Sequence, residues 1–398
     1  MARLYKTLKN YRHVKNFPIH FDTIIKATFL DRKNRFLVKC YTDENETIDA
    51  YLPNPGRLWE LLLPGVTLFV SLDQISKNAS NPHRKTHYTV LAVQKNGFIV
   101  FLHTHITNKV AKYLIEKKLL PPFIDTDIIK EEVPLGNSRF DFLLRENKRD
   151  HYLEVKSCTL FGNNVAMFPD AATERGKKHL LKLAEMGRSG IKSSILFIVH
   201  CFHVKWFMPD FHTDYDFSIH MIKSRNDLNI FAVAIKWNPD LTISNTVKPL
   251  EIPWKYIETE AKDRGSYLLI LRIDKKRDIT IGRLGLLEFE KGYYIYVGSA
   301  MNSLSSRIKR HMKKRKKGHW HIDYLLNNAD EMTPIPIRSS KRLECEIAGA
   351  VSSIMNQGYS GFGSSDCGCP THLFHSKNNP LHCKAFHDVL QRFRMCHP

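Results

Sequence analysis

Two short segments separated by a polar loop constrain this chain more than any other feature. The first, residues 138–142, reads Ser-Arg-Phe-Asp-Phe, and the second, residues 152–156, reads Tyr-Leu-Glu-Val-Lys. Both have the apolar alternation of a strand, in which successive side chains point to opposite faces. Asp141 therefore lies on the face opposite its two phenylalanine neighbours. The same rule places Glu154 and Lys156 together on one face.

The polar loop at residues 145–150 predicts that the two strands pair as a hairpin, which brings Asp141, Glu154 and Lys156 to one point. Two carboxylates so placed can hold a divalent cation, Mg²⁺ or Mn²⁺, through oxygen ligands. The lysine can then position the attacking water or offset charge on a phosphate. The alternative is a solvated Glu-Lys salt bridge, which is worth very little.

Further motifs make the pattern specific: Pro-Asn-Pro-Gly-Arg-Leu at residues 53–58, Phe-Pro-Asp-Ala at 168–171 and Glu-Arg-Gly at 174–176. With them, residues 23–237 resemble the sugar fermentation stimulation protein family. The resemblance implies an OB-like barrel followed by a PD-(D/E)XK nuclease-like α/β domain, and it implies DNA binding. Asp141, Glu154 and Lys156 would then form the core site. Glu132 would be an accessory carboxylate.

Composition points to a polyanionic partner. The 398 residues carry 60 Lys and Arg against 40 Asp and Glu, a net charge of +20, which favours nucleic acid first and an anionic membrane surface second. No apolar run reaches the length of a membrane span, so we expect no membrane partner. The basic, polar N-terminus does not resemble a signal peptide, and eight scattered cysteines fit reduced thiols. We therefore expect a cytoplasmic protein.

The pattern predicts a multidomain α/β and α+β protein. We expect a basic arm and OB-like barrel at residues 1–95, a PD-(D/E)XK nuclease-like domain at 96–238, a proline-containing linker at 239–262 and a second module at 263–398. Strands are expected across residues 23–93 and at 194–201, and helices at 108–118 and 174–186. The loop aspartates near residues 210–216 are expected to be solvated.

The second module has two predicted strands, residues 266–271 and 292–300, followed by a helix over 304–317. That helix has eight basic and no acidic residues. A charge run is often only a solvated face, but here no opposite charge relieves the repulsion, which favours a phosphate-binding surface.

This module resembles a divergent GIY-YIG nuclease domain. The resemblance implies that Tyr267 and Tyr296 position or deprotonate the attacking water, that Arg307 stabilises the phosphate, and that Glu344, or alternatively Glu346, holds a divalent metal. The sequence departs from the family in its first motif, Ser-Tyr-Leu, and in an insertion over residues 275–290. Binding is therefore a safer expectation here than catalysis.

Cysteine and histidine residues gather near the C-terminus and suggest a Zn²⁺ site, although their Cys-x-Cys spacing is unusual. They are Cys367, Cys369, His372, His375, His382 and Cys383. His311, His319 and His321 are candidate proton-transfer groups, with ordinary surface or core histidines as the alternative.

We interpret the chain as a DNA-binding, divalent-metal-dependent nuclease. The alternative is a non-catalytic DNA-binding transcriptional regulator with degenerate nuclease folds, and a third interpretation is RNA processing. For Arg57, a structural bond to a carbonyl or carboxylate is as good an explanation as phosphate contact. The basic side chains expected to contact nucleic acid are Arg57, Arg139, Arg175, Lys178, Lys309, Arg310, Lys313 and Lys314.

Overall fold

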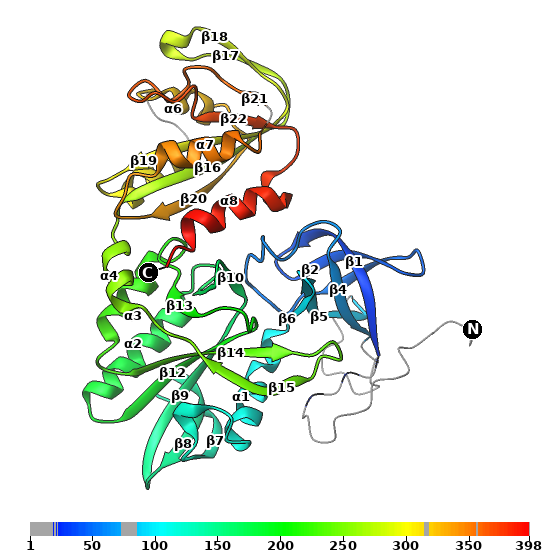
Figure 1. Ribbon diagram of the computed structural model, residues 1–398, viewed down its shortest axis with the longest axis vertical. Coiled ribbons are helices and arrows are strands. Elements are labelled where there is room, and N and C mark those ends of the chain that lie inside the picture. Colours follow the sequence, from blue (N-terminus) through cyan, green and yellow to red (C-terminus); the bar gives the residue numbers. More distant parts are fainter. Residues whose placement is uncertain are drawn as a thin grey trace. The chain divides into compact units, whose positions relative to one another are not determined.

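The computed structural model describes residues 19, 21, 23–72, 86–313, 318–355 and 357–397. Most of the predicted basic arm and Lys314 lie outside these residues. The chain divides into unit 1, Met1–Pro209 with His220–Ile252, and unit 2, Asp210–Ile219 with Pro253–Pro398 (Figure 1). Among the described helices, none combines the length and the apolar character needed to cross a membrane.

Five strands at the start of unit 1 close into the predicted OB-like barrel. Their order is β3-β2-β1-β4-β5, and β3 pairs with β5 to complete the circuit. Alternating burial along β2, with Val38 and Cys40 inside, shows the core face of the barrel wall. The strands are β1 (Ile24–Asn34), β2 (Leu37–Thr42), β3 (Thr47–Tyr51), β4 (Thr67–Leu72) and β5 (Tyr88–Lys95).

The sheet continues from the barrel into the nuclease-like α/β part, in the order β5-β6-β14-β12-β9-β8-β7. Strand β12 runs parallel to both neighbours and is buried along almost its whole length, as is typical of a central strand with both faces covered. These elements are β6 (Phe98–Phe101), α1 (Thr107–Glu116), β7 (Thr126–Leu135), β8 (Ser138–Glu146), β9 (Arg149–Cys158), α2 (Glu174–Arg188), β12 (Lys192–Val199) and β14 (Asn229–Trp237).

The hairpin between β8 and β9 is tighter than the sequence predicted. Asn147 and Lys148 alone form the turn, both with positive φ (49° and 65°), as a two-residue hairpin loop of this hand requires. The rest of the expected loop extends the two strands, where Arg145 pairs with Asp150 and Glu146 with Arg149.

The predicted linker at residues 239–262 is wrong. It contains β15 (Ile243–Pro249), which pairs antiparallel with β14, and α4 (Trp254–Glu260). Pro249 ends β15 and Pro253 precedes the first turn of α4, positions where a missing N–H costs little. Unit 1 also contains a small sheet of β10 (Leu160–Gly162), β11 (Val165–Phe168) and β13 (Trp206–Pro209).

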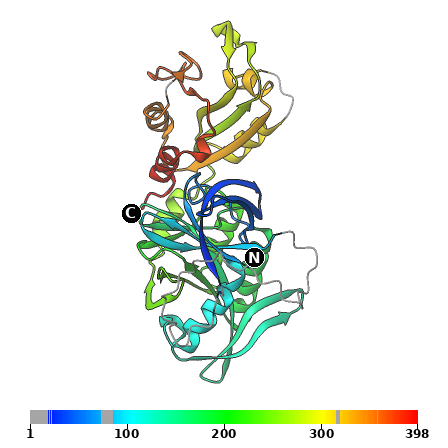
Figure 2. The same cartoon turned by 90° about the vertical axis from the view of Figure 1, so that its right-hand side faces the viewer.

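Unit 2 is built on a five-stranded antiparallel sheet in the order β20-β16-β19-β22-β21. The insertion predicted at residues 275–290 forms a separate hairpin of β17 and β18, which projects from the rest of this unit (Figures 1 and 2). The strands are β16 (Gly265–Ile273), β17 (Arg277–Thr280), β18 (Leu286–Phe289), β19 (Gly292–Ala300), β20 (Glu331–Arg338), β21 (Gln357–Gly358) and β22 (Leu373–Ser376).

The helices of unit 2 include a shorter basic helix than expected. Helix α5 ends at Met312, since Lys313 already has an extended backbone (ψ 128°), so the predicted helix over 304–317 is too long. Besides α4, the helices of this unit are α5 (Leu304–Met312), α6 (His321–Leu326), α7 (Glu344–Ser352) and α8 (Lys384–Arg394), while α3 (Tyr215–Ser224) begins in the 210–219 segment. Short 3₁₀ turns lie at Thr104–Ile106, Pro121–Phe123, Gly282–Leu284 and Pro380–His382.

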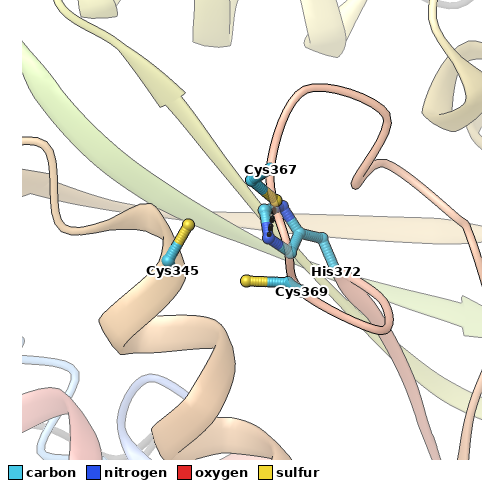
Figure 3. Close-up of side chains that lie close together, drawn as sticks. All are labelled: Cys345, Cys367, Cys369 and His372. Carbon is cyan, nitrogen blue, oxygen red and sulfur yellow. Dashed lines mark hydrogen bonds between the residues drawn. The ribbon is translucent and has the colours of Figure 1, made fainter.

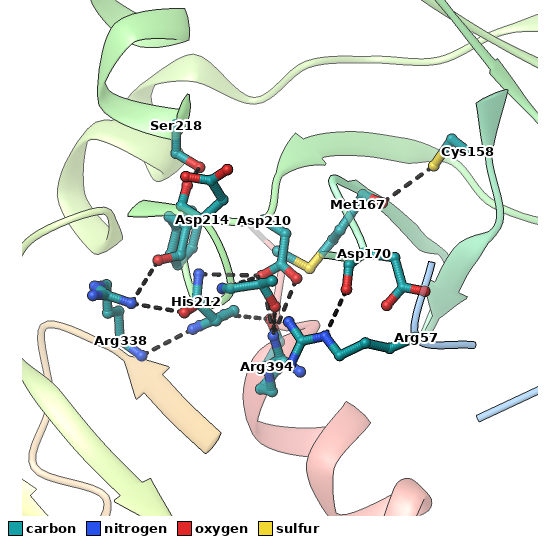
Figure 4. A network of polar contacts seen from close by, with 12 residues as sticks. Arg57, Cys158, Met167, Asp170, Asp210, His212, Asp214, Ser218, Arg338 and Arg394 are labelled. Carbon is teal, nitrogen blue, oxygen red and sulfur yellow. Dashed lines mark hydrogen bonds and ion pairs between the residues drawn. The ribbon is translucent and has the colours of Figure 1, made fainter. Parts of the chain in front are cut away.

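The expectation that the aspartates near residues 210–216 are solvated is wrong for Asp210. Its carboxylate is fully buried and lies 3.1 Å from the Arg394 guanidinium (Figure 4). Arg338 of β20 donates to the carbonyls of Phe211 and His212, each at 2.8 Å. These contacts tie residues 210–219 to unit 2, because buried charges need partners.

Gly298 allows β19 to lie against Tyr267, and this makes a prediction about stability. A Cβ at residue 298 would lie 2.5 Å from the Tyr267 hydroxyl, and that ring is 2% exposed. We expect Gly298→Ala to lower the free energy of unfolding by about 1–3 kcal/mol through overpacking. Thermal melting or denaturant titration measures the change.

Gly349→Ala is the matched control, because Gly349 lies in α7 with no atom within 4 Å of the added Cβ. Alanine is the better helix former, so this control should be neutral or raise stability by up to about 1 kcal/mol. Equal shifts for both variants would contradict the packing argument.

Candidate functional site

Asp141, Glu154 and Lys156, which the sequence predicted to converge, lie close together in unit 1. Asp141 of β8 accepts a hydrogen bond at Oδ2 from the Val155 N–H of β9, at 2.7 Å. On the same strand, Lys156 Nζ donates to Glu154 Oε1. Strand pairing with Phe142 opposite Leu153 sets this register. The alternation of one apolar and one polar face was sufficient to predict the cluster.

Two further residues complete the site, and neither was assigned to it from the sequence. His179 of α2 lies with Nδ1 2.5 Å from Glu154 Oε1. Asn108 of α1 donates from Nδ2 to Asp141 Oδ1 at 2.7 Å. His179 lies one helical turn after Arg175 on α2, but no local pattern connects His179 or Asn108 with a carboxylate on a distant strand.

The two carboxyl groups have opposite electrostatic environments. Burial, and then the nearby charge of Glu154, raise the pKa of Asp141 from the ordinary 3.8 to about 6, although the Val155 N–H and Lys156 oppose this. Burial also acts to raise the pKa of Glu154. There the His179 hydrogen bond and the Lys156 charge outweigh it, so the pKa lies below the usual 4.5.

The carboxylate of Glu154 keeps one oxygen without a partner. Glu154 is 2% exposed, and its Oε2 makes no hydrogen bond to any described residue. A buried carboxylate oxygen left unsatisfied is costly, which makes it a ready ligand for a cation. Asp141, whose ionised form is disfavoured by the charge of Glu154, would gain from the same ion. These residues therefore fit a hard divalent cation.

The basic residues predicted around this site have different environments. Arg175 and Lys178 are not buried on α2. Arg139 is exposed and pairs with Glu132, whose own side chain is about half exposed, at 2.8 Å. Glu132 thus has an arginine as its partner, and its role as an accessory carboxylate stays a prediction.

Arg57 makes a structural hydrogen bond to a carbonyl, one of the two roles that the sequence suggested for it. Its Nε donates to the Asp170 carbonyl at 2.7 Å, as Figure 4 shows, and its guanidinium lies 4.7 Å from the Trp59 ring centre. The Asp170 carboxylate in turn accepts from the Leu58 N–H at 2.7 Å. The 53–58 and 168–171 motifs thus hold each other within unit 1, and phosphate contact by Arg57 stays a prediction.

A second candidate site is a cavity of about 540 Å³ in unit 2. Tyr267 of β16 and Tyr296 of β19 lie side by side on neighbouring strands, with ring centres 6.3 Å apart. Glu344, at the start of α7, lines the cavity, whereas Glu346 is exposed and is absent from its wall. The structure thereby favours Glu344 over Glu346. The wall also includes Ser299, Arg307, His319, Trp320, His321, Arg342, Gly363, Ser365 and Asp366.

The two arginines of α5 differ in their availability to a ligand. Arg310 forms a two-pronged ion pair with buried Asp323, at 3.0 and 2.7 Å, so its charge is already offset. Both guanidinium carbons lie over the Trp320 ring, that of Arg307 at 4.1 Å and that of Arg310 at 4.0 Å from its centre. Of the two, Arg307 lines the cavity and forms no ion pair with a carboxylate among the described residues. Lys309 and Lys313 are exposed. Arg307 is therefore the stronger anion-binding group of the cavity.

Proton chemistry in the cavity centres on Tyr267. Burial raises the pKa of its hydroxyl, and the oxygen lies 2.9 Å from His311 Nε2. A buried phenol with a raised pKa needs an acceptor to lose its proton, and His311 is placed to be one. Burial also favours the neutral form of Glu344, but nearby His372 and the Ser299 hydroxyl outweigh it and lower its pKa.

Comparison with known proteins agrees with a barrel followed by a nuclease-like part in unit 1. Residues 30–102 match the SfsA N-terminal OB domain, and residues 105–241 match the sugar fermentation stimulation protein RE domain. A sugar fermentation stimulation protein homolog of Clostridium tetani is 37% identical over 228 residues, which cover 56% of this chain and 96% of the relative. The chain belongs to the sugar fermentation stimulation protein family. The predicted barrel and nuclease-like domain are thus confirmed.

Other relatives agree over the same region. A homolog of this family from Desulfitobacterium hafniense is 36% identical over 204 residues, covering 51% of this chain and 85% of the relative. The solved structure of Pyrococcus furiosus SfsA in complex with Ca²⁺ is similar with a TM-score of 0.53 and 27% identity, covering 59% of this chain and 97% of that one. Residues 266–395 match a separate model, the domain of unknown function DUF123, which is GIY-YIG-like.

The raised pKa of Asp141 predicts a pH-dependent stability in protein freed of metal. Between about pH 4 and pH 6 the folded protein keeps a proton on Asp141 that the unfolded chain has lost, so stability falls as pH rises through this window. The contribution is at most about 3 kcal/mol. The difference in unfolding free energy between wild type and Asp141→Asn, measured across these pH values, isolates it.

Asp127→Asn is the control for this experiment, since that carboxylate lies on the neighbouring strand β7 with 82% of its side chain exposed. This variant shows how the same substitution changes the free energy of unfolding at an exposed carboxylate. If the difference between wild type and Asp141→Asn stays constant across the window, the carboxyl of Asp141 is not held in its neutral form.

Proposed function

We propose that this protein binds DNA and hydrolyses its phosphodiester bonds with a divalent cation, at the site formed by Asp141, Glu154 and Lys156. The observation that carries the proposal is the buried Oε2 of Glu154, without a partner among the described residues, beside a second carboxyl group whose pKa is raised. A net charge of +20 supports a polyanionic substrate. RNA is the second choice of substrate.

A divalent cation is supported by a relative, and its position in this chain is proposed from the residues. The Pyrococcus furiosus protein was solved with Ca²⁺, which takes the oxygen ligands that Mg²⁺ and Mn²⁺ also prefer. In the present chain Asp141 and Glu154 would hold the ion. When bound, such an ion offsets charge on the phosphate and makes a bound water more acidic.

The other residues of the site position these two carboxylates. Asn108 and the Val155 N–H fix the two oxygens of Asp141. His179 fixes one oxygen of Glu154, which leaves the other for the ion. Lys156 has a side chain that is 16% exposed, and its ammonium group pairs with Glu154 Oε1; from this position it would orient the attacking water or meet the phosphate.

The cavity of unit 2 is proposed to bind a phosphate of the same class of substrate. Arg307 would contact the phosphate, and Glu344 would hold a divalent ion. Tyr267, with His311 as its proton acceptor, would position or deprotonate a water molecule. Because the first motif departs from the family, we assign binding to this unit before a second cleavage.

One observation favours the alternative of a non-catalytic DNA-binding regulator. Glu154 already pairs with Lys156 and His179, so its negative charge is offset without any ion. A site that is electrostatically complete in this way needs no metal. The two functions differ in a single measurable property, which is metal-dependent cleavage.

We expect purified wild type to cleave plasmid or single-stranded DNA when Mg²⁺ or Mn²⁺ is added, and Asp141→Asn to lower the rate by about 100-fold or more. Glu344→Gln tests unit 2 in the same assay. Gel analysis of the products over a metal titration measures both effects, and an RNA of equal length compares the two substrates.

Two matched controls accompany these variants. Glu131→Gln changes an exposed carboxylate on β7 that pairs with Lys112, and Glu346→Gln changes the exposed neighbour of Glu344 on α7. Neither should alter cleavage. Binding of DNA by wild type without cleavage in any divalent ion establishes the regulator instead.

DNA binding itself predicts a salt dependence to which the cations of α2 contribute. Arg175→Ala with Lys178→Ala should weaken binding uniformly across sequences and reduce the slope of log K against log salt by about 0.9 for each phosphate that is no longer neutralised. Fluorescence anisotropy at several salt concentrations measures this slope. Lys182→Ala is the control, because Lys182 on the same helix is already paired with Glu185 at 2.9 Å; an equal weakening in this control contradicts a specific role for the two cations.

A further inference from the structure

Four metal-binding side chains of unit 2 converge from two separate segments. Cys345 lies in the first turn of α7, while Cys367, Cys369 and His372 lie in the loop before β22. Their ligand atoms all lie within 4.8 Å of one another, and Figure 3 shows the three sulfur atoms and the imidazole directed at a common point. His372 Nε2 is 3.5 Å from Cys367 Sγ.

This set differs from the one that the sequence suggested. His375 is instead 3.4 Å from the Lys291 carbonyl, and His382 and Cys383 are exposed near the start of α8. None of these three belongs to the cluster found among the described residues. Cys345 takes their place, and its sequence distance from the other ligands hid it.

The chemistry and size of the cluster select one kind of occupant. Three thiols and one imidazole form the Cys₃His set that binds Zn²⁺ tetrahedrally, with bonds of about 2.3 Å to sulfur and about 2.0 Å to nitrogen. Ligand atoms within 4.8 Å of one another need only small shifts to reach such a geometry. So compact a set surrounds a single ion and leaves no room for an iron–sulfur cluster. Four protein ligands leave no open position, which is typical of a structural site.

We infer that Cys345, Cys367, Cys369 and His372 bind one Zn²⁺ ion that fastens the 361–372 loop to the start of α7. The inference does not rest on the proposed function, because none of these four ligands lines the cavity or belongs to the site of unit 1. The ion would anchor this loop on α7, a helix that lies earlier in the chain.

The same cluster would position the wall of the cavity. Gly363, Ser365 and Asp366 of this loop line the cavity, and Glu344 directly precedes the ligand Cys345. The second imidazole nitrogen of His372, Nδ1, lies 3.4 Å from Glu344 Oε1. When Nε2 binds a metal, the proton is fixed on Nδ1, which then faces a carboxylate, an arrangement common behind zinc ligands. Zinc would thereby hold Glu344 in place.

The test is the metal content of the full chain, purified without an affinity tag. We expect about one zinc per chain by plasma mass spectrometry, as for a closed structural site. Cys369→Ser and His372→Asn should each lower this content and the melting temperature. Cys383→Ser is the matched control: it removes an exposed cysteine of the same unit outside the cluster and should retain the zinc.

Two measurements keep the inference falsifiable if a variant fails to fold. Cobalt added to wild type after zinc removal should give the visible absorption of a tetrahedral cobalt–thiolate site, and readdition of zinc should abolish it. Wild type that has no zinc and does not bind cobalt, or that has a disulfide among these cysteines or bound iron, overturns the assignment. Zinc content is read without any cleavage assay, so failure of the nuclease proposal leaves this result unaffected.

Discussion

The burial of Glu154 and the partial burial of Asp141, at the junction of β8 and β9, are the constraint on which unit 1 depends. Removing a carboxylate from water is costly unless donors replace the lost hydration. Asp141 receives donors from α1 and from the β9 backbone, and Glu154 receives them from β9 and α2. Both helices and the hairpin must therefore be in place before the site is stable. Of the four oxygens of these two groups, Glu154 Oε2 is the one without a partner among the described residues, and a cation would use it.

In unit 2 a partly buried carboxylate is likewise supported by neighbouring side chains, but it faces a cavity. Glu344 is also partly buried, and it is supported by Ser299 and by nearby His372, a histidine from another segment. Here the carboxylate opens onto a cavity that a stacked arginine also lines, so a negative and a positive side chain face the same space. The histidine that supports it belongs to the proposed zinc cluster. Unit 1 thus supports its carboxylates from two helices and β9, whereas unit 2 supports Glu344 from β19 and from the 361–372 loop.

The barrel and the nuclease-like part form one body because they share a sheet. Trp237 of β14 pairs with Ile99 of β6, and its ring stacks on Phe101 with centres 4.0 Å apart. Elsewhere in unit 1, Gly56 approaches Asp170 so closely that a Cβ would lie 2.7 Å from its carboxylate. The motifs that identify the family are therefore contacts between the two parts of unit 1, and the barrel helps to fix the loop that leads into α2.

Local periodicity in the sequence was enough to predict many of the helices and strands and the three side chains of the unit 1 site. Alternation along residues 138–142 and 152–156 fixed which side chains share a face, and it correctly brought Asp141, Glu154 and Lys156 together. The same reasoning located α1, α2, β12 and the tyrosine strands of unit 2, because helix and strand periods are properties of neighbouring residues. It failed at the 239–262 segment, where prolines suggested a linker but the edge of β14 accepted another strand.

The tertiary structure alone decided which distant residues complete each site. No spacing rule links Asn108 or His179 with a carboxylate on another strand, or Cys345 with cysteines beyond the next strand. The choice of Glu344 over Glu346 likewise depends on how α7 faces the cavity. These contacts form between segments far apart in the chain, and their geometry follows from sheet order and helix packing. A sequence pattern records only what neighbouring side chains require of one another.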